Sequence, residues 1–305
     1  MNSTTTMYID QTSPAANTSA GRLGDYIQMA KPRISALVLV TVAVGGFVAS
    51  WAQPQLLTLM SAVFGTALVA TSATIWNQWI ERDSDLLMER TADRPIATRR
   101  ISAWEVTAVG GGMLIGGFLF LLFAVNWNTA ILAAVTWALY VLAYTPMKQR
   151  SSWNTLVGAI PGALPVLIGW SATGQPFDVR AVALFMVVFL WQFPHFMSIA
   201  WLYRKQYGNA GIKMITVVDP SGKRAGIQAV VGAMALLPVS LVPAAMSPPS
   251  LVYVITALIL GGMFLMSAIR FQADRNDQTA RRLLRTSLIY LPTVMLGLAC
   301  IPLMS

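Results

Sequence analysis

The sequence predicts an all-α, polytopic membrane protein. Of its 305 residues, 56% are hydrophobic and only 11% are charged, whereas about a quarter of the residues in a soluble domain are charged. Apolar runs of roughly 17–25 residues, the length that a helix needs to cross a bilayer, recur from Ile34 to the C-terminus. The polar interruptions between these runs are short, so we expect no sizeable soluble domain.

The apolar runs predict nine transmembrane helices. We divide the chain into a polar tail, residues 1–33, and a membrane domain, residues 34–305. The predicted helices span residues 34–52, 56–80, 104–124, 128–146, 152–172, 180–203, 226–246, 249–271 and 283–303.

Lys and Arg are distributed unevenly over the two sides of this arrangement. If the N-terminal tail and every second connection lie on one side, that side holds 20 of the 21 basic residues and leaves Arg180 alone on the other. Cytoplasmic connections carry an excess of Lys and Arg, so the N-terminus and this side are predicted to be cytoplasmic. The tail resembles neither a secretory signal nor an Arg-rich transit peptide, which favours a multi-pass protein of the bacterial inner membrane.

The net charge of +9 does not predict nucleic-acid binding, because the basic residues lie in the connections, where anionic lipid headgroups of the bilayer explain them. The single cysteine, Cys300, excludes an internal disulfide and is expected to serve packing.

Three polar side chains follow one another at the end of the second predicted span. Asn77, Glu81 and Asp85 are four residues apart and therefore fall within an arc of about 80° on one helix face. Such oxygen ligands suit Mg²⁺, which is commonly held by one or two carboxylates while it bridges substrate phosphates. A solvated helix end is the alternative interpretation. Six of the twelve acidic residues lie between Glu81 and Glu105, which favours a metal site.

We call Asn77, Glu81 and Asp85 the ladder. The basic residues that follow the ladder in the sequence suit an anion. Arg90 and Arg94 follow within ten residues of Asp85, and a guanidinium can bind phosphate oxygens in a bidentate manner. Together the ladder and these arginines predict a diphosphate site on the cytoplasmic face.

A second polar constellation ends the sixth predicted span. His195 is the only histidine of the chain and lies within the motif WQFPHF. A lone histidine in an apolar helix is more often structural, although an ionisable group inside a membrane is also a functional hypothesis. Gln206 lies eleven residues further on, close to three helical turns, so the two side chains share a face if the helix continues that far.

These motifs together resemble the UbiA-type intramembrane prenyltransferases, and within them the branch that uses heme as the acceptor. The resemblance extends from the first predicted span to the loop after the sixth. The matching blocks are KPRI at 31–34, residues 77–95, YTPMKQR at 144–150, residues 153–154, GAIPGALP at 158–165 with residues 169–170, and residues 191–211.

The resemblance implies a nine-helix bundle around a central cavity that transfers the farnesyl group of farnesyl diphosphate to a vinyl group of heme b, with water addition. The products would be heme O and diphosphate, and the cofactor would be Mg²⁺. The residues implied for the metal are Asn77, Glu81 and Asp85; those for the diphosphate are Lys31, Arg33, Arg90, Arg94, Lys148, Arg150 and Lys213; and those that position heme or water are His195, Tyr203 and Tyr207.

One position departs from the family's pattern. Relatives usually have Asp where this chain has Gln206, and Gln brings no negative charge. The site could therefore hold one metal ion, bound chiefly by Asn77, Glu81 and Asp85, and the alternative of two metal ions stays open. Other heme-pathway or oxidase-assembly proteins are conceivable partners.

Two alternatives to this function stay open at the level of sequence. A related prenyltransferase would use a quinone precursor or a chlorin as acceptor. A polytopic transporter or a non-enzymatic oxidase-assembly factor would use the acidic ladder for ions or structure.

Overall fold

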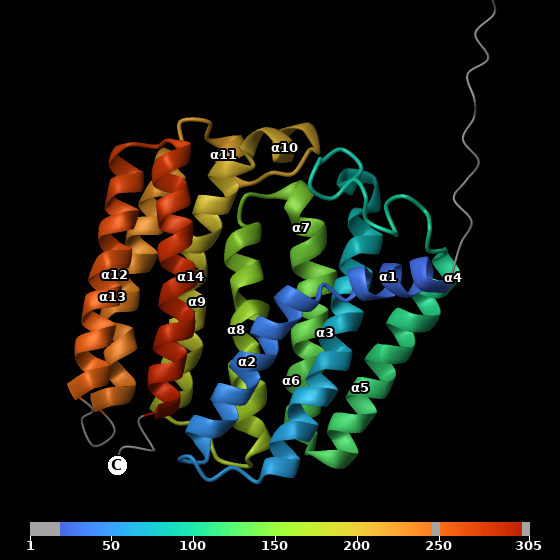
Figure 1. The fold of residues 1–305 in the computed structure, drawn as a ribbon, viewed down its shortest axis with the longest axis horizontal. Coiled ribbons are helices and arrows are strands. Elements are labelled where there is room, and N and C mark those ends of the chain that lie inside the picture. Colours follow the sequence, from blue (N-terminus) through green and yellow to red (C-terminus); the bar gives the residue numbers. More distant parts are fainter. Residues whose placement is uncertain (1–18, 246–250, 301–305) are drawn as a thin grey trace, which may run out of the picture.

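The computed structural model describes residues 19–245 and 251–300, which form helices and turns without any strand. The all-α prediction is therefore confirmed. Figure 1 shows the elements, which are α1 (Ser19–Met29), α2 (Pro32–Ala49), α3 (Leu56–Asp85), α4 (Ala103–Glu105), the π-helix η1 (Val106–Gly110), α5 (Gly111–Ala124), α6 (Trp127–Ala138), the π-helix η2 (Leu139–Tyr144), α7 (Thr145–Arg150), α8 (Asn154–Ala172), α9 (Val179–Leu202), α10 (Arg204–Asn209), α11 (Ile215–Val218), α12 (Lys223–Ala245), α13 (Leu251–Ala273) and α14 (Asp277–Cys300).

Eight helical segments of the described residues are long and apolar enough to cross a membrane. Two of them are composite, because α4, η1 and α5 run on as one segment and so do α6, η2 and α7. α2 contributes a shorter apolar stretch, Ser35–Ala49, where the first span was predicted. A polytopic membrane protein is thus confirmed. The count of nine spans, the cytoplasmic N-terminus and the central cavity remain predictions, and the predicted seventh, eighth and ninth spans reach in part outside the described residues.

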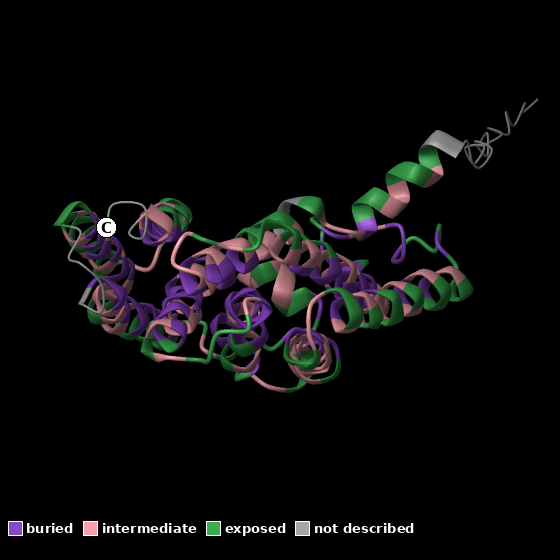
Figure 2. Ribbon diagram, turned by 90° about the horizontal axis from the view of Figure 1, so that it is seen from below, coloured by how far each residue is buried: buried purple, intermediate pink, exposed green. Residues whose placement is uncertain are grey.

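The long helices form a ring in which successive helices pack side by side. The contacting pairs are α2–α3, α3–α5, α5–α6, α6–α8, α8–α9, α9–α12, α12–α13, α13–α14 and α14–α2. Further contacts cross the ring, among them α2 with α8, α9 with α14 and α3 with α8. Buried residues face the neighbouring helices and exposed residues face outward (Figure 2). Large apolar side chains such as Leu57, Phe123 and Trp104 are exposed on the outside, as contact with lipid requires.

Glycines permit the close contact between α2 and α8. A Cβ atom built on Gly169 would overlap the carbonyl oxygen of Val42, and one built on Gly45 would overlap that of Val166. Only glycine allows two backbones to approach this closely. A Cβ atom on Gly262 of α13, by contrast, would meet nothing within 4 Å.

α1 belongs to the predicted tail and lies at an angle to the upright helices (Figure 1). Its C-terminal end is fixed to α3, because the side chains of Thr74 and Gln78 both donate hydrogen bonds of 2.8 Å to the carbonyl oxygen of Met29. Tyr26 donates a 2.7 Å hydrogen bond to Glu105 at the start of the next span. The last part of the tail is therefore docked on the membrane domain.

The glycine contact between α2 and α8 yields a test of the packing. Gly169→Ala is expected to lower the free energy of unfolding by about 1–3 kcal/mol, because an added methyl group forces the two backbones apart. Thermal unfolding in detergent measures the effect. Gly262→Ala is the matched control and should be neutral or slightly stabilising, since alanine favours a helix; equal unfolding temperatures for the two variants would contradict the close contact.

Candidate functional site

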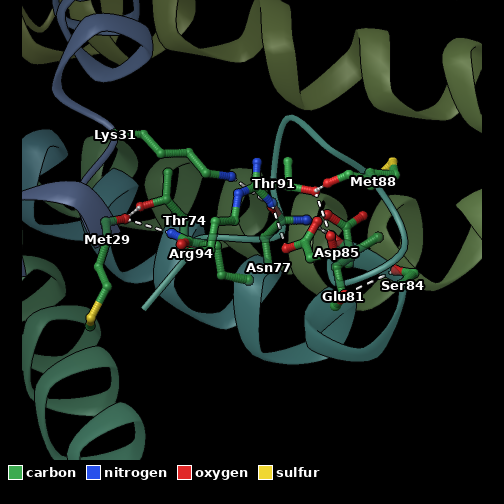
Figure 3. Close-up of polar contacts among 12 residues, drawn as sticks. Met29, Lys31, Thr74, Asn77, Glu81, Ser84, Asp85, Met88, Thr91 and Arg94 are labelled. Atoms are coloured by element: carbon green, nitrogen blue, oxygen red, sulfur yellow. Dashed lines mark hydrogen bonds and ion pairs between the residues drawn. The ribbon is translucent and has the colours of Figure 1, made fainter. Parts of the chain in front are cut away.

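The predicted ladder is buried at the C-terminal end of α3, and each rung meets a basic side chain from another part of the chain. The relative exposures of Asn77, Glu81 and Asp85 are 1%, 7% and 1%. Their partners are Lys31 at 3.1 Å from Asn77, Lys148 at 2.7 Å from Glu81, and Arg94 at 2.6 Å from Asp85. Lys31, Arg94 and the three ladder residues point toward one another in Figure 3.

Lys31 reaches the ladder from the link between α1 and α2. Its backbone has φ 46° and ψ 60°, the left-handed region that costs a non-glycine residue of order 1–3 kcal/mol. The link is held in this conformation by the bonds to Met29 on one side and by Pro32, the first residue of α2, on the other. Enclosure by protein, followed by the nearby charge of Arg94, lowers the pKa of Lys31 to about 7. An anion at this point would favour the charged ammonium.

Lys148 reaches the ladder from α7, which follows the π-helix η2. Its Nζ lies 4.6 Å from the ring centroid of Tyr144, and Tyr140 packs 5.4 Å from Tyr144. Asn77 donates a 3.1 Å hydrogen bond to Thr145, whose hydroxyl donates to the carbonyl oxygen of Tyr140 at 2.8 Å. Single π-helical turns are common at functional sites, and here the turn carries both tyrosines to the ladder.

Arg94 reaches the ladder from the turns that follow α3. The hydroxyl of Thr91 donates a 2.9 Å hydrogen bond to the carbonyl oxygen of Asp85, so the chain folds back over the end of its own helix. The Arg94 side chain is 19% exposed and that of Asp85 is 1% exposed. The ion pair is therefore shielded from water.

The charges at the ladder favour an anion. Two carboxylates, Glu81 and Asp85, face three basic groups, Lys31, Lys148 and Arg94. With Lys31 protonated, these groups carry one surplus positive charge before any substrate binds. A diphosphate brings several negative charges, so a divalent cation that accompanies it would restore the balance.

The donor set also fits a hard cation. Asp85 Oδ1 is buried without a hydrogen-bond partner, while its Oδ2 pairs with Arg94. Among the described residues no group of three or more His, Cys, Asp or Glu side chains could hold a metal ion. For a metal ion at the ladder, the protein would supply two carboxylates and an amide oxygen, and substrate phosphates and water would complete the shell, as is usual for Mg²⁺.

The other predicted diphosphate residues lie further out. Arg90, Arg150 and Lys213 are exposed, and Arg90 stacks 4.8 Å over the ring of Tyr203. The backbone of Lys213 donates a 2.7 Å hydrogen bond to the carbonyl oxygen of Lys148, which ties its loop to α7. The side chain of Arg33 lies outside what the structure describes.

The second constellation does not form one continuous helix face. α9 ends at Leu202, and Tyr203, with φ −107° and ψ 16°, separates it from α10. A shared face of His195 and Gln206 required a helix that continues as far as Gln206, and this condition is not met. Gln206 instead lies 3.5 Å from Glu89, in the loop after α3.

His195 faces α14 rather than the ladder. Its Nδ1 lies 2.8 Å from Ser287 Oγ, and its ring stacks on Trp191 at 4.5 Å between centroids. The rings of Tyr203 and Tyr207 lie 6.5 Å apart, at the end of α9 and in α10. The structure therefore separates the predicted site residues into a charged cluster on α3 and an aromatic wall on α9 and α10.

Sequence reasoning missed several residues of the site. Tyr140 and Tyr144 precede Lys148 at intervals of four residues, so helical spacing alone would have placed them beside it. Ser287 offered no such signal, because it is 92 residues from His195.

Known proteins of one family are similar to this chain. Residues 38–291 match the UbiA prenyltransferase family. A protoheme IX farnesyltransferase from Solibacter usitatus (strain Ellin6076) is 43% identical over 279 residues, which are 88% of this chain and 96% of that protein. A protoheme IX farnesyltransferase from Rhodopirellula baltica is 40% identical over 278 residues, 88% of this chain and 97% of that protein.

Solved structures share the fold at lower identity. A digeranylgeranylglyceryl phosphate synthase superposes with a TM-score of 0.79 at 16% identity, over 93% of this chain and 99% of that one. A UbiA homolog from Archaeoglobus fulgidus bound to DMAPP and Mg²⁺ superposes with a TM-score of 0.62 at 14% identity, over 90% and 99%. At these identities the likeness supports the fold alone.

The buried pair of Glu81 and Lys148 yields a test of the site's geometry. Lys148→Met is expected to lower the free energy of unfolding by about 3–5 kcal/mol, because it leaves a buried carboxylate without its counter-ion. Thermal unfolding checks this, and the added substitution Glu81→Gln should restore part of the loss. Arg150→Met, two residues further on and exposed, is the matched control. A loss no larger than the control's would mean that the pair does not form.

Proposed function

The chain belongs to the UbiA prenyltransferase family, and we propose that it transfers the farnesyl group of farnesyl diphosphate to a vinyl group of protoheme IX. Water adds in the same conversion, and the products are heme O and diphosphate. The observation that carries the proposal is the buried ladder of Asn77, Glu81 and Asp85, each paired with a basic side chain from a different segment. Relatives with the corresponding name align over nearly their full length.

The ladder is suited to the diphosphate end of the substrate. Asn77, Glu81 and Asp85 are the residues that would hold Mg²⁺, and the unpartnered Asp85 Oδ1 supports this assignment. A bound Mg²⁺ would act as a Lewis acid toward the phosphate oxygens. The basic residues of the ladder and the outer ones named above would bind the oxygens that remain.

Lys31, Lys148 and Arg94 would stabilise the leaving group. When the allylic carbon–oxygen bond breaks, its electron pair stays on the diphosphate oxygen, and preorganised cations in a shielded site stabilise that developing charge. Burial lowers the pKa of Lys31 to about 7, and the negative charge of a bound diphosphate would favour its charged form. Tyr140 and Tyr144 present aromatic rings beside Lys148, and such rings can also face a positive allylic carbon.

The acceptor supplies the electrons for the new bond. The terminal carbon of a vinyl group bonds to the first carbon of the farnesyl group, and the positive charge moves to the vinyl carbon next to the porphyrin. Water adds there as hydroxyl and releases one proton. The site must therefore admit one water while the surrounding apolar helices keep bulk water from the allyl cation. His195, Tyr203 and Tyr207 are proposed to position the heme or that water.

Two features support a cytoplasmic active site in a cell inner membrane. The ladder lies at the end of α3 that leads into the loop with Arg90, Arg94, Arg99 and Arg100, and the side of the predicted spans to which this loop belongs holds 20 of the 21 Lys and Arg residues. We propose residues 1–33 as the cytoplasmic tail, of which α1 docks beside the site, and residues 34–305 as the catalytic membrane domain. The fold alone does not choose the acceptor, since a digeranylgeranylglyceryl phosphate synthase shares it. The named relatives favour heme.

The activity is tested with purified protein in lipid nanodiscs, heme b, farnesyl diphosphate and Mg²⁺. We expect the mass of the extracted heme to increase by one farnesyl group plus water. Asp85→Asn should slow the reaction by about a hundredfold or more, as removal of a charge-stabilising group does in other active sites, and a chelator should abolish it.

Asp83→Asn is the matched control. Asp83 lies on the same helix, but its side chain is 79% exposed, so its rate should stay within about twofold of the wild type, as is usual for exposed charges with little interaction energy. Unmodified heme with a folded wild-type protein would refute the proposed acceptor, and equal rates for the two variants would refute the ladder as the site.

A further inference from the structure

His195 is hydrogen-bonded to α14 through Ser287. The hydroxyl of Ser287 has a single proton and lies within donating distance, 2.6 Å, of the carbonyl oxygen of Leu284. When it donates there, Ser287 Oγ accepts in its 2.8 Å contact with His195 Nδ1. Nδ1 then carries the proton, and in a neutral imidazole the other nitrogen, Nε2, presents a lone pair.

The orientation of the ring is fixed as well. Trp191 stacks on the imidazole with an interplanar angle of 20°, and its own indole nitrogen donates a 2.8 Å hydrogen bond to the carbonyl oxygen of Ser287. Two residues of α9 thus bind the same residue of α14, where these helices run side by side (Figure 1). This clamp leaves the ring little freedom to turn.

The clamp leaves the Nε2 edge of the ring open. Ser287 is fully buried and Trp191 is 5% exposed, whereas His195 itself is only half-buried. Ser287 bonds Nδ1, Trp191 covers one face and Phe196 meets the ring at an angle of 71°, which leaves Nε2 as the ring nitrogen that these neighbours do not engage. Within the described part of the chain, Nε2 has no hydrogen-bond partner. An acceptor in an apolar bundle is costly unless a ligand engages it.

We propose that His195 Nε2 is the axial ligand of the heme iron and that Ser287 is its positioning residue; this assignment rests on the proposed function. Neutral imidazole is the usual protein ligand of heme iron. A metal-binding histidine almost always donates its other N–H to a fixed acceptor, which sets the tautomer and raises the basicity of the ligating nitrogen. Ser287, itself bonded to Leu284, is such an acceptor.

The position of His195 agrees with the shape of the two substrates. His195 precedes Tyr203 by eight residues, which is about 12 Å along a helix axis. The ring of Tyr203 stacks against Arg90, which belongs to the loop that follows the ladder. A porphyrin bound at His195 would thus lie deeper in the membrane than the diphosphate, where the isoprenoid chain also enters.

Heme titration of the purified, full-length protein tests the proposal. Ferric heme b is added to protein in nanodiscs, and absorption and electron paramagnetic resonance spectra report the iron ligand. The affinity tag must contain no histidine, because His195 is the only histidine of the chain. The wild type should show an imidazole-ligated iron. His195→Gly should lose this signature and bind heme at least tenfold more weakly, and added imidazole should restore the signature.

Ser287→Ala and Ser198→Ala form a matched pair. Both serines are fully buried, but Ser198 bonds only the backbone carbonyl of His195, at 2.6 Å. Ser287→Ala should weaken heme binding severalfold and shift the spectrum, and Ser198→Ala should change neither. If His195→Gly fails to fold, these two serine variants still test the proposal. Equal heme affinities of Ser287→Ala and Ser198→Ala would overturn the positioning role of Ser287.

The outcomes separate this inference from the proposed function. Identical iron spectra for the wild type and His195→Gly would overturn the ligation, while farnesylated heme from the wild type would leave the proposed function intact. A folded wild type that neither binds heme nor modifies it would overturn both. An imidazole signature that disappears with His195 and returns with imidazole would establish the ligation.

Discussion

The pairing of buried polar groups at the end of α3 with basic side chains from distant segments is the constraint on which the site depends. A carboxylate removed from water is stable only beside a counter-charge or hydrogen-bond donors. Asn77, Glu81 and Asp85 obtain theirs from three different segments: the link before α2, the helix α7 and the turns after α3. The ladder therefore brings these segments to one point, and the site exists only when all of them are in place.

The same pairing suits a site that binds and releases an anion. Lys31 and Arg94 point toward the ladder (Figure 3), so their contacts with it could be exchanged for contacts with substrate phosphates. The left-handed backbone of Lys31 and the π-helix before Lys148 are both unfavourable or uncommon conformations, and such conformations persist where the surrounding structure enforces them. Here packing of the bundle holds both cations in position.

A second wall of the bundle has a different chemistry. Where α9 packs against α14, His195, Trp191 and Ser287 form one unit joined by hydrogen bonds and ring stacking, whereas the charged residues of α14 (Asp277, Arg281, Arg282 and Arg285) lie toward its N-terminal end. Charged groups thus gather at the end of the helices and a neutral imidazole lies deeper, which follows from the rising cost of burying charge toward the membrane centre. An amphiphilic substrate with an anionic head and apolar remainder matches this gradient.

The sequence by itself determined the fold class, the approximate spans and the ladder, because all three depend on periodicity within one helix. A run of apolar residues predicts a span wherever it packs, and residues four apart share a face in any helix. Only the tertiary structure decided which cation meets which rung, where α9 breaks, how closely α2 approaches α8 and which way His195 faces. Those features depend on contacts between residues far apart in the chain, such as the 46 residues between Lys31 and Asn77 or the 92 between His195 and Ser287, and no local pattern encodes them.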